Sequence, residues 1–430
     1  MAVKVSDNKR TFIKDGKKFF YLADTCWSAF TNITIEEWEY YLNLRKMQGF
    51  NVLQINIMPQ WDASGTDLNY YPLPTKDKKT FEFTDFNMEY FERAKTMCKM
   101  AKDKGFELAL VVLWCNYVPG TWASNMNSSN IMPYDFIDKY VEVVHSTFSD
   151  LEPMYVISGD TDFDTDDTKK YYMKASNLLR KIAPNLLQTL HIKGRLDEIP
   201  EEFIDKIDFY MYQSGHNAQN LAMPYLLAET LYKKYPAKPL LNSEPCYEQM
   251  GFSRRMYGRF YRYDVRRAAW MSILSGASAG VTYGAHGIYS WHKINKNFGL
   301  GIGEGFDAPN PWNDAVKYPG AWDYGYIKYI FEMYNIEELV PMDKILNEVK
   351  DIRMAGTLEK DKMFIYVPVN TTVKVDLDLS NYKIKIMDLE DKNICIPNYE
   401  IVNGKTIINM HNFEQDGLII LEKGAVALAE

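Results

Sequence analysis

The sequence predicts an α/β protein, a (β/α)8 barrel followed by a small antiparallel β-sandwich. Two observations lead to this prediction. Over about the first 340 residues, eight short apolar runs alternate with helix-like segments; beyond that point the runs become short and alternating, with Asn, Gly and Asp turns between them. We therefore divide the chain into a barrel, residues 1–340, and a β-sandwich, residues 341–430.

The first half of the barrel is predicted from its turns and helix caps. A hairpin around Asp15 and Gly16 leads into a first strand that ends near residue 25. Thr34 and Glu37 form a capping box that begins the first helix. The following strands are expected at 50–58, 106–114 and 154–160, and further helices at 86–104 and 135–148.

The second half repeats the same alternation. Further strands are expected at 186–191, 207–212, 239–244 and 279–283, and further helices at 171–183, 221–235, 263–275 and 324–337. The sandwich is expected to contain strands at 363–367, 372–377, 383–387 and 417–421. Since no long polar linker separates the two parts, we expect them to pack together.

Composition narrows the function classes. The 430 residues carry a net charge of −8, which argues against nucleic acid as a partner. Five cysteines without CxxC spacing and six histidines without an HExxH pair predict neither disulfides, nor a metal site, nor a cofactor. Residues 1–10 lack the apolar core of a secretion signal and no apolar run is long enough to span a membrane, which predicts a cytoplasmic protein.

Two of the predicted strands end on carboxylates, at Asp160 and Glu244. Because parallel barrel strands place their carboxyl ends at one rim, we expect the two acids to converge. A retaining glycosidase needs such a pair, with Asp160 as general acid and base and Glu244 as nucleophile. The general acid must stay protonated near neutral pH, and the negative charge of Asp162 or Glu244 could raise the pKa of Asp160 in this way. Asp160 could instead cap a helix. Glu248 is an alternative candidate for the nucleophile, although a role in orienting a neighbouring side chain or in binding a hydroxyl fits Glu248 better.

Other polar and aromatic side chains also follow predicted strands, and we expect them to bind sugar. The aromatic content is 14%, and aromatic rings are common platforms for sugar faces, although large barrels also bury many rings. A lone His is more often structural, and Asp24 could cap the next helix instead of binding sugar. The candidates are Asp24, Trp27, Trp114, His191, Tyr212, His216, Glu248, Tyr283, His286 and Trp291.

Two motifs resemble those of other enzyme classes without matching them. The glycine-rich segment 299–305 lacks the Lys-Ser/Thr pair of a phosphate-binding loop, so we interpret it as a lid or active-site loop. Ser243 lacks the GxSxG context of a serine hydrolase. Neither motif changes the glycosidase interpretation.

Several segments taken together carry a family resemblance: residues 20–27, 49–54, 158–160, 242–248, 266–270 and 275–286. In these segments the chain resembles the apiosidase-like TIM-barrel glycosidases, glycoside hydrolase family 140 and its relatives, over about residues 10–340. The resemblance implies Asp160 as acid and base and Glu244 as nucleophile. Residues 345–430 resemble the β-sandwich often appended to this barrel and named for collagen binding, a name from which no function follows. One departure is at Trp291, which relatives tend to place directly after Ile, so the pocket wall is expected to differ.

These observations predict a retaining, exo-acting glycosidase that removes a terminal apiose-like or other pentose from plant-derived oligosaccharides. Many relatives are secreted, so the missing export signal points toward small imported oligosaccharides as substrates. The alternatives are an endo-acting, cellulase-like β-glycanase and a non-catalytic carbohydrate-binding barrel. The sequence does not predict the anomer or the oligomeric state.

Overall fold

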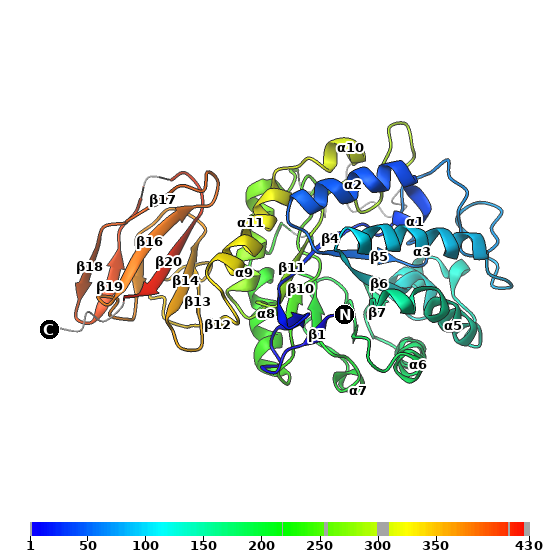
Figure 1. Cartoon of the computed structure of the whole chain (residues 1–430), viewed down its shortest axis with the longest axis horizontal. Coiled ribbons are helices and arrows are strands. Elements are labelled where there is room, and N and C mark those ends of the chain that lie inside the picture. The colour runs from blue at the N-terminus through cyan, green and yellow to red at the C-terminus, as the bar shows by residue number, and fades with distance from the viewer. Residues whose placement is uncertain (1, 217, 253–256, 299–308, 412, 425–430) are drawn as a thin grey trace.

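The barrel is built on one parallel sheet (Figure 1). The computed structural model describes residues 2–216, 218–252, 257–298, 309–411 and 413–424, so the glycine-rich segment 299–305 lies outside the described residues. The sheet strands are β4 (Tyr21–Thr25), β5 (Val52–Asn56), β6 (Glu107–Trp114), β7 (Met154–Gly159), β8 (Gln188–Thr189), β9 (Tyr210–Tyr212), β10 (Leu240–Asn242) and β11 (Gly280–Tyr283). Their order within the described chain is β8-β7-β6-β5-β4-β11-β10-β9.

The sheet closes almost completely on itself. β4 is the first strand of this sheet along the chain, and β11 is its last. β4 pairs with β5 on one side and with β11 on the other. At the remaining edge, the backbone N–H of Asp208 donates to the carbonyl of Gln188 at 2.8 Å, and the Thr189 hydroxyl donates to the carbonyl of Phe209 at 2.6 Å. These bonds join β8 to the residues before β9. The predicted (β/α)8 barrel is therefore confirmed.

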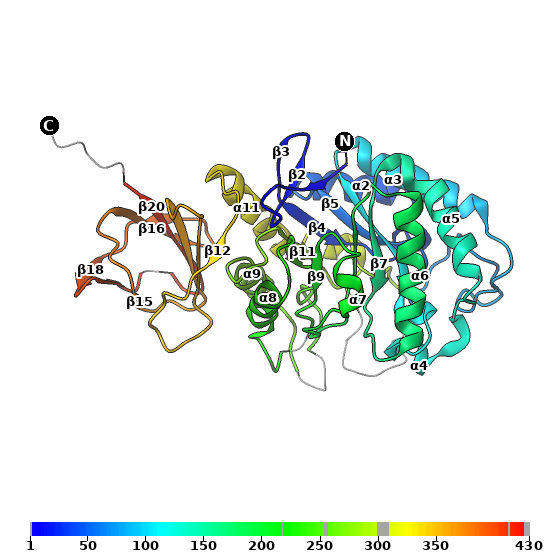
Figure 2. The ribbon, with the colours of Figure 1, turned by 90° about the horizontal axis from the view of Figure 1, so that it is seen from below.

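The long helices surround this sheet (Figures 1 and 2). They are α2 (Ile35–Met47), α3 (Met88–Asp103), α5 (Phe136–Phe148), α6 (Asp166–Ile182), α8 (Met223–Lys234), α9 (Arg262–Ile273) and α11 (Gly320–Met333). The capping box of Thr34 and Glu37 forms as predicted. α6 begins five residues before its predicted start, because the Thr165 side chain accepts a hydrogen bond from the Thr168 N–H and caps the helix there. α11 begins and ends four residues before its predicted bounds.

Several short elements complete the barrel. The predicted hairpin around Asp15 forms from β2 and β3. Between β8 and β9, the barrel has only a single helical turn, where the sequence analysis predicted no helix. The short elements are β1 (Lys4–Val5), β2 (Phe12–Lys14), β3 (Lys17–Phe19), α1 (Ala29–Asn32), α4 (Trp122–Met126), α7 (Glu201–Ile204) and α10 (Trp312–Ala315).

Two antiparallel sheets follow the barrel and form the predicted sandwich (Figure 1). The larger sheet contains, in order, β12 (Val340–Pro341), β13 (Arg353–Gly356), β14 (Lys362–Val367), β20 (Gly417–Lys423), β16 (Tyr382–Asp388) and β17 (Ile394–Cys395). The smaller contains β15 (Val373–Val375), β19 (Lys405–Ile408) and β18 (Tyr399–Val402). Since β12 already pairs with β13, we propose to keep the division of the chain at residue 340.

The larger sheet is apolar on both faces. On β14, Met363 and Ile365 pack in the sandwich core, while Phe364 and Tyr366 belong to the core of the barrel. β20 alternates in the same way. A strand that is buried on both faces reads as a continuous apolar run, which accounts for the sequence of both strands. The two parts therefore pack together, as predicted.

No helix within the described ranges combines the length and the apolar character that a membrane crossing requires.

Candidate active site

The two predicted catalytic acids lie at the carboxyl ends of their strands. Asp160 directly follows β7, and Glu244 lies two residues beyond the end of β10. Asp160 has a φ of 46°, in the left-handed region, which turns the chain sharply as it leaves the sheet. A Cβ atom on Gly159 would lie 2.0 Å from the ring of Trp114, so only glycine allows that ring to lie against the strand end.

Two histidines hold the carboxylate of Glu244. Nε2 of His216 lies 3.0 Å from Oε1, and Nε2 of His191 lies 3.3 Å from Oε2. The backbone N–H of Tyr247 donates to Nδ1 of His216, and the backbone N–H of Asp160 donates to Nδ1 of His191. In each ring Nδ1 is therefore the acceptor, and the proton lies on the Nε2 that faces Glu244.

The two acids are biased toward opposite protonation states. Burial, followed by the negative charge of Glu244, raises the pKa of Asp160 well above its usual value, against a 2.9 Å hydrogen bond from Gln213 Nε2. Burial alone would raise the pKa of Glu244 too, but the contacts from His191 and His216 outweigh it and lower that pKa to about 2. One carboxyl therefore keeps its proton toward neutral pH while the other is an anion, which are the states of a general acid and a nucleophile.

Gln213 and His191 connect the two acids physically. Nε2 of Gln213, which donates to Asp160, also lies 3.4 Å from Nδ1 of His191. His191 in turn faces Glu244. The four side chains come from the carboxyl ends of four strands, β7, β8, β9 and β10, and form one polar cluster.

Aromatic rings surround this cluster. The ring centroids of Trp27 and Trp114 are 5.2 Å apart, and Trp114 stacks on His191 at 5.8 Å. The Trp27 indole donates to the Tyr247 hydroxyl at 3.0 Å, and the Tyr247 ring lies 4.4 Å from that of His216. These contacts bring four of the predicted sugar-binding residues, Trp27, Trp114, His191 and His216, to the two predicted catalytic acids.

His286 lies at the edge of the same group. Its ring stacks on Tyr289 at 6.0 Å, and the Tyr289 ring lies 5.3 Å from that of Tyr247. Burial lowers the pKa of His286 to about 3, so the ring is neutral at physiological pH.

Five residues of this group were not predicted from the sequence. They are Asp62, Trp122, Gln213, Tyr247 and Tyr289. Asp62 and Gln213 follow β5 and β9, so the same strand-end rule could have selected them. Burial, together with the negative charge of Glu244, raises the pKa of Asp62 to about 7, which makes it a second carboxyl capable of holding a proton.

Comparison with known proteins supplies the family. The apiosidase-like catalytic domain matches residues 6–338. The chain belongs to the apiosidase-like family. This membership makes it a glycosidase, an enzyme that hydrolyses O-glycosyl bonds of carbohydrates.

Solved structures related to this apiosidase-like protein share its whole architecture. A structure described as a glycoside hydrolase superposes with a TM-score of 0.80 at 22% identity, covering 98% of this chain and 97% of its own. A glycoside hydrolase family 5 protein from Bacteroides vulgatus superposes with a TM-score of 0.81 at 22% identity, covering 100% of this chain and 94% of its own. At this identity the likeness shows the fold. No curated protein matches the chain.

Some predicted sugar-binding residues of this apiosidase-like protein have protein partners instead. The Tyr212 hydroxyl donates to the carbonyl of Pro224 at the start of α8. The Tyr283 hydroxyl donates to Glu248 at 2.6 Å, and the Trp291 indole donates to Glu37 of α2 at 3.1 Å. For these residues a part in sugar binding stays a prediction.

Asp24 forms a buried ion pair. Its Oδ2 accepts from Nε of Arg45 at 2.6 Å and from the Tyr41 hydroxyl at 2.7 Å, and both charged side chains are fully buried. Burial raises the pKa of Asp24, and Arg45 acts against that rise. In this environment Asp24 anchors α2 to β4, and its part in sugar binding stays a prediction.

Replacing Arg45 with methionine is expected to lower the free energy of unfolding by about 3–5 kcal/mol, because Asp24 would be left buried without its counter-charge. Urea denaturation followed by circular dichroism measures the change. As a control, Lys328→Met breaks an i,i+4 pair with the exposed Glu332 and should cost less than about 1 kcal/mol. A loss below about 1 kcal/mol for Arg45→Met would contradict the prediction.

Among the described residues, no three His, Cys, Asp or Glu side chains converge as metal ligands would.

Gln213→Met should shift the basic limb of the activity profile to higher pH. The Gln213 amide donates to Asp160 and so favours its charged form; losing that bond raises the pKa of Asp160 further. Because the acid must be protonated for the first step, activity is lost as pH rises through that pKa, and the loss would come at higher pH in the variant. A profile of kcat/KM against pH measures the shift, and an unchanged or lowered basic limb would contradict it.

Proposed function

We propose that this apiosidase-like protein is a retaining, exo-acting glycosidase that removes a terminal pentose, apiose or a similar sugar, from plant-derived oligosaccharides. The observation that carries the proposal is the opposed pKa shifts of Asp160 and Glu244 within one polar cluster. The family match supports a carbohydrate substrate. The aromatic rings of Trp27 and Trp114 beside the cluster fit the apolar face of a sugar.

In the first step, a Glu244 oxygen attacks the anomeric carbon while Asp160 gives its proton to the departing glycosidic oxygen. The C–O bond to the leaving group breaks and an ester bond to Glu244 forms. The Nε2–H group of His216 holds one oxygen of the attacking carboxylate, and Nε2 of His191 lies 3.3 Å from the other.

Formation of the ester also prepares the second step. Glu244 loses its negative charge, and that charge is one cause of the raised pKa of Asp160. The pKa of Asp160 therefore falls, and its carboxylate can take a proton from the water that attacks the anomeric carbon. The sugar leaves with its original configuration, and both acids return to their starting states.

A panel of aryl pentosides and hexosides, with products followed by NMR, tests the proposal. The expected result is hydrolysis of a pentoside with the anomeric configuration of the first product retained; an inverted product would contradict the retaining mechanism. With oligosaccharides, exo action releases only monosaccharide from the start, whereas an endo-glycanase releases short oligosaccharides.

A non-catalytic carbohydrate-binding barrel would give a different result. The wild type would be inert on the whole panel, and Asp160→Ala and Glu244→Ala variants would keep full sugar affinity. Isothermal titration with the same oligosaccharides distinguishes this outcome from an enzyme whose substrate is absent from the panel, because the latter would bind none of them.

A further inference from the structure

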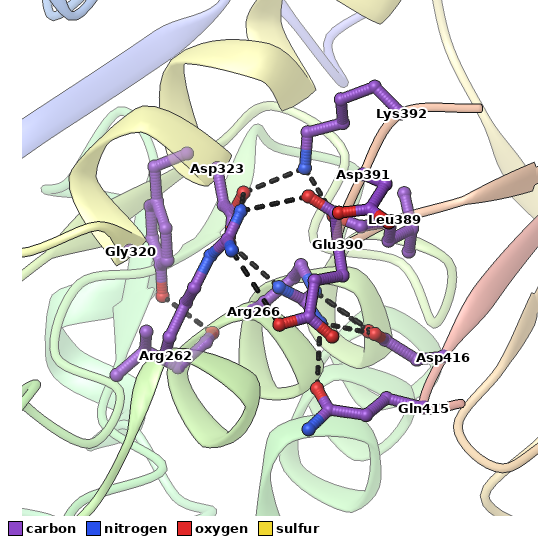
Figure 3. A network of polar contacts seen from close by, with 12 residues as sticks. Arg262, Arg266, Gly320, Asp323, Leu389, Glu390, Asp391, Lys392, Gln415 and Asp416 are labelled. Atoms are coloured by element: carbon purple, nitrogen blue, oxygen red, sulfur yellow. Dashed lines mark hydrogen bonds and ion pairs between the residues drawn. The ribbon is translucent and has the colours of Figure 1, made fainter. Parts of the chain in front are cut away.

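The segment 266–270, part of the family resemblance, lies on α9 and takes no part in the catalytic cluster. Its first residue, Arg266, points toward the sandwich (Figure 3). Nε of Arg266 lies 3.1 and 3.0 Å from the two carboxylate oxygens of Asp416, which directly precedes β20. The Tyr366 hydroxyl on β14 donates to the same carboxylate at 3.0 Å. Arg266 and Asp416 are 1% and 0% exposed, so the pair is fully buried between the barrel and the sandwich.

The same arginine reaches α11 through Asp323. Nη1 of Arg266 lies 2.8 Å from Oδ2 of Asp323, which also accepts from Nε of Arg262 at 2.8 Å. Nζ of Lys392, in the turn between β16 and β17, lies 2.7 Å from Oδ1 of Asp323 (Figure 3). Two acids and three cations from two helices and the sandwich thus form one cluster, which we call the junction cluster: Arg262, Arg266, Asp323, Lys392 and Asp416.

α11 connects this cluster to the segment that follows the nucleophile. Gly320, the first residue of α11 and one turn from Asp323, donates its backbone N–H to Oε2 of Glu248 at 2.9 Å. A Cβ atom at position 320 would lie 2.3 Å from that oxygen, so the contact requires glycine. Glu248 is 1% exposed and lies four residues after Glu244.

The segment between Glu244 and Glu248 is short, and backbone hydrogen bonds fix it at both ends. The carbonyl of Glu244 accepts from Gly215, and the backbone of Glu248 bonds to Gly284 and His286 on either side. Between them, the Tyr247 N–H sets the tautomer of His216, which holds Glu244. A shift of Glu248 would therefore move the group that orients the nucleophile.

We propose that the C-terminal sandwich is a positioning element of the active site: through Asp416 and Lys392 it fixes α9 and α11, and the N-terminus of α11 in turn fixes Glu248 and the segment 244–250. The kinetic part of this proposal rests on the proposed role of Glu244. The structural part does not depend on it.

Hydrogen exchange in the full-length chain tests the structural part. Asp416→Asn removes the negative charge that the sandwich contributes to the junction cluster. The expected result is exchange about 10-fold faster for the amides of residues 246–250, of which those of residues 247–250 donate to His216, Gly284, Phe260 and Tyr247 in turn. Each protein is measured at the same interval below its own unfolding midpoint, so that a general loss of stability does not produce the effect.

The neighbouring arginine of the same segment gives the matched control. Nη2 of Arg267 lies 2.6 Å from Oδ2 of Asp351, and this pair also joins α9 to the sandwich but includes no residue of α11. Asp351→Asn is expected to leave exchange at residues 246–250 unchanged. If Asp416→Asn does not fold, Lys392→Met replaces it, since it removes one of three cations from Asp323 and leaves the pair of Arg266 and Asp416 intact.

Equal exchange at residues 246–250 in both variants, or no change in either, would overturn the proposal. On a cleaved glycoside, Asp416→Asn should lower kcat about 10-fold with little change in KM, Asp416→Glu should restore part of it, and Asp351→Asn should match the wild type. An unchanged kcat in Asp416→Asn would overturn the kinetic part. If the wild type cleaves no glycoside, the proposed function fails while the exchange experiment still decides the structural part.

Discussion

Glu244→Gln is expected to lower kcat/KM by about 10⁴-fold or more, equivalent to about 5.5 kcal/mol of lost transition-state stabilisation. The amide has nearly the shape of the carboxylate but cannot form the ester with the anomeric carbon. Initial rates on the best aryl glycoside measure the loss, and thermal unfolding verifies that the fold is kept.

A surface glutamate provides the control for this variant. Glu198 pairs with Lys234 and its side chain is 70% exposed, so Glu198→Gln should leave kcat/KM unchanged. If Glu244→Gln kept activity within about 10-fold of the wild type, another carboxyl would have to be the nucleophile, and Glu244 would only bind or orient the substrate.

Asp160→Ala is expected to reduce turnover of an oligosaccharide by about 10²–10⁴-fold, the range that general acid catalysis contributes. An aryl glycoside with an acidic phenol needs little help in leaving, so its cleavage should suffer far less in the first step. The covalent intermediate then accumulates because no base activates water. Added azide should restore turnover and give a glycosyl azide of retained configuration.

A variant of Asp62 tests whether Asp160 is correctly assigned as the general acid and base. Its pKa is raised to about 7, so it too can hold a proton beside Glu244. Asp62→Asn should lower kcat/KM less than Asp160→Ala does, and azide should not rescue it. Rescue of Asp62→Asn and not of Asp160→Ala would transfer the role of acid and base to Asp62.

The barrel could be predicted because its strands are short, buried and regularly separated by helices. The run from Leu108 to Trp114 is apolar throughout because both faces of β6 are covered, and its end is marked by the loss of that pattern. Helix starts were less predictable, since the start of α6 depends on a single threonine cap. The link between β8 and β9 gave no periodic signal, because α7 has only four residues.

The convergence of Asp160 and Glu244 could be predicted for a topological reason. Parallel strands bring Asp160 and Glu244 to one rim whatever the loops between them do. The sequence does not indicate on which side of the sheet a side chain lies, so the bonds of Asp24 and Tyr212 to groups on the surrounding helices could not be predicted; their part in sugar binding stays a prediction. Gln213 directly follows β9, so the same rule could have selected it, but its bond to Asp160, 53 residues away, could not be predicted.

The sandwich and its packing against the barrel were predicted, but the residues that form the interface were not. Phe364 and Tyr366 looked like ordinary strand residues, yet they belong to the barrel core. Arg266 was noticed only as part of a family segment, because its partner Asp416 lies 150 residues later in the chain. Contacts at such separations leave no periodic signal in the sequence.

That separation has a consequence during synthesis on the ribosome. β4 is the first strand of the barrel sheet to emerge, but it cannot complete its pairing until β11 has been translated. Even then, Arg266 lacks its partner Asp416 until the residues directly before β20 have left the exit tunnel. Until then, the nascent barrel exposes an apolar face, and the guanidinium of Arg266 is incompletely neutralised. We expect a chain that ends at a premature stop codon after residue 340 to keep this apolar face exposed and to be a target of chaperones and proteases.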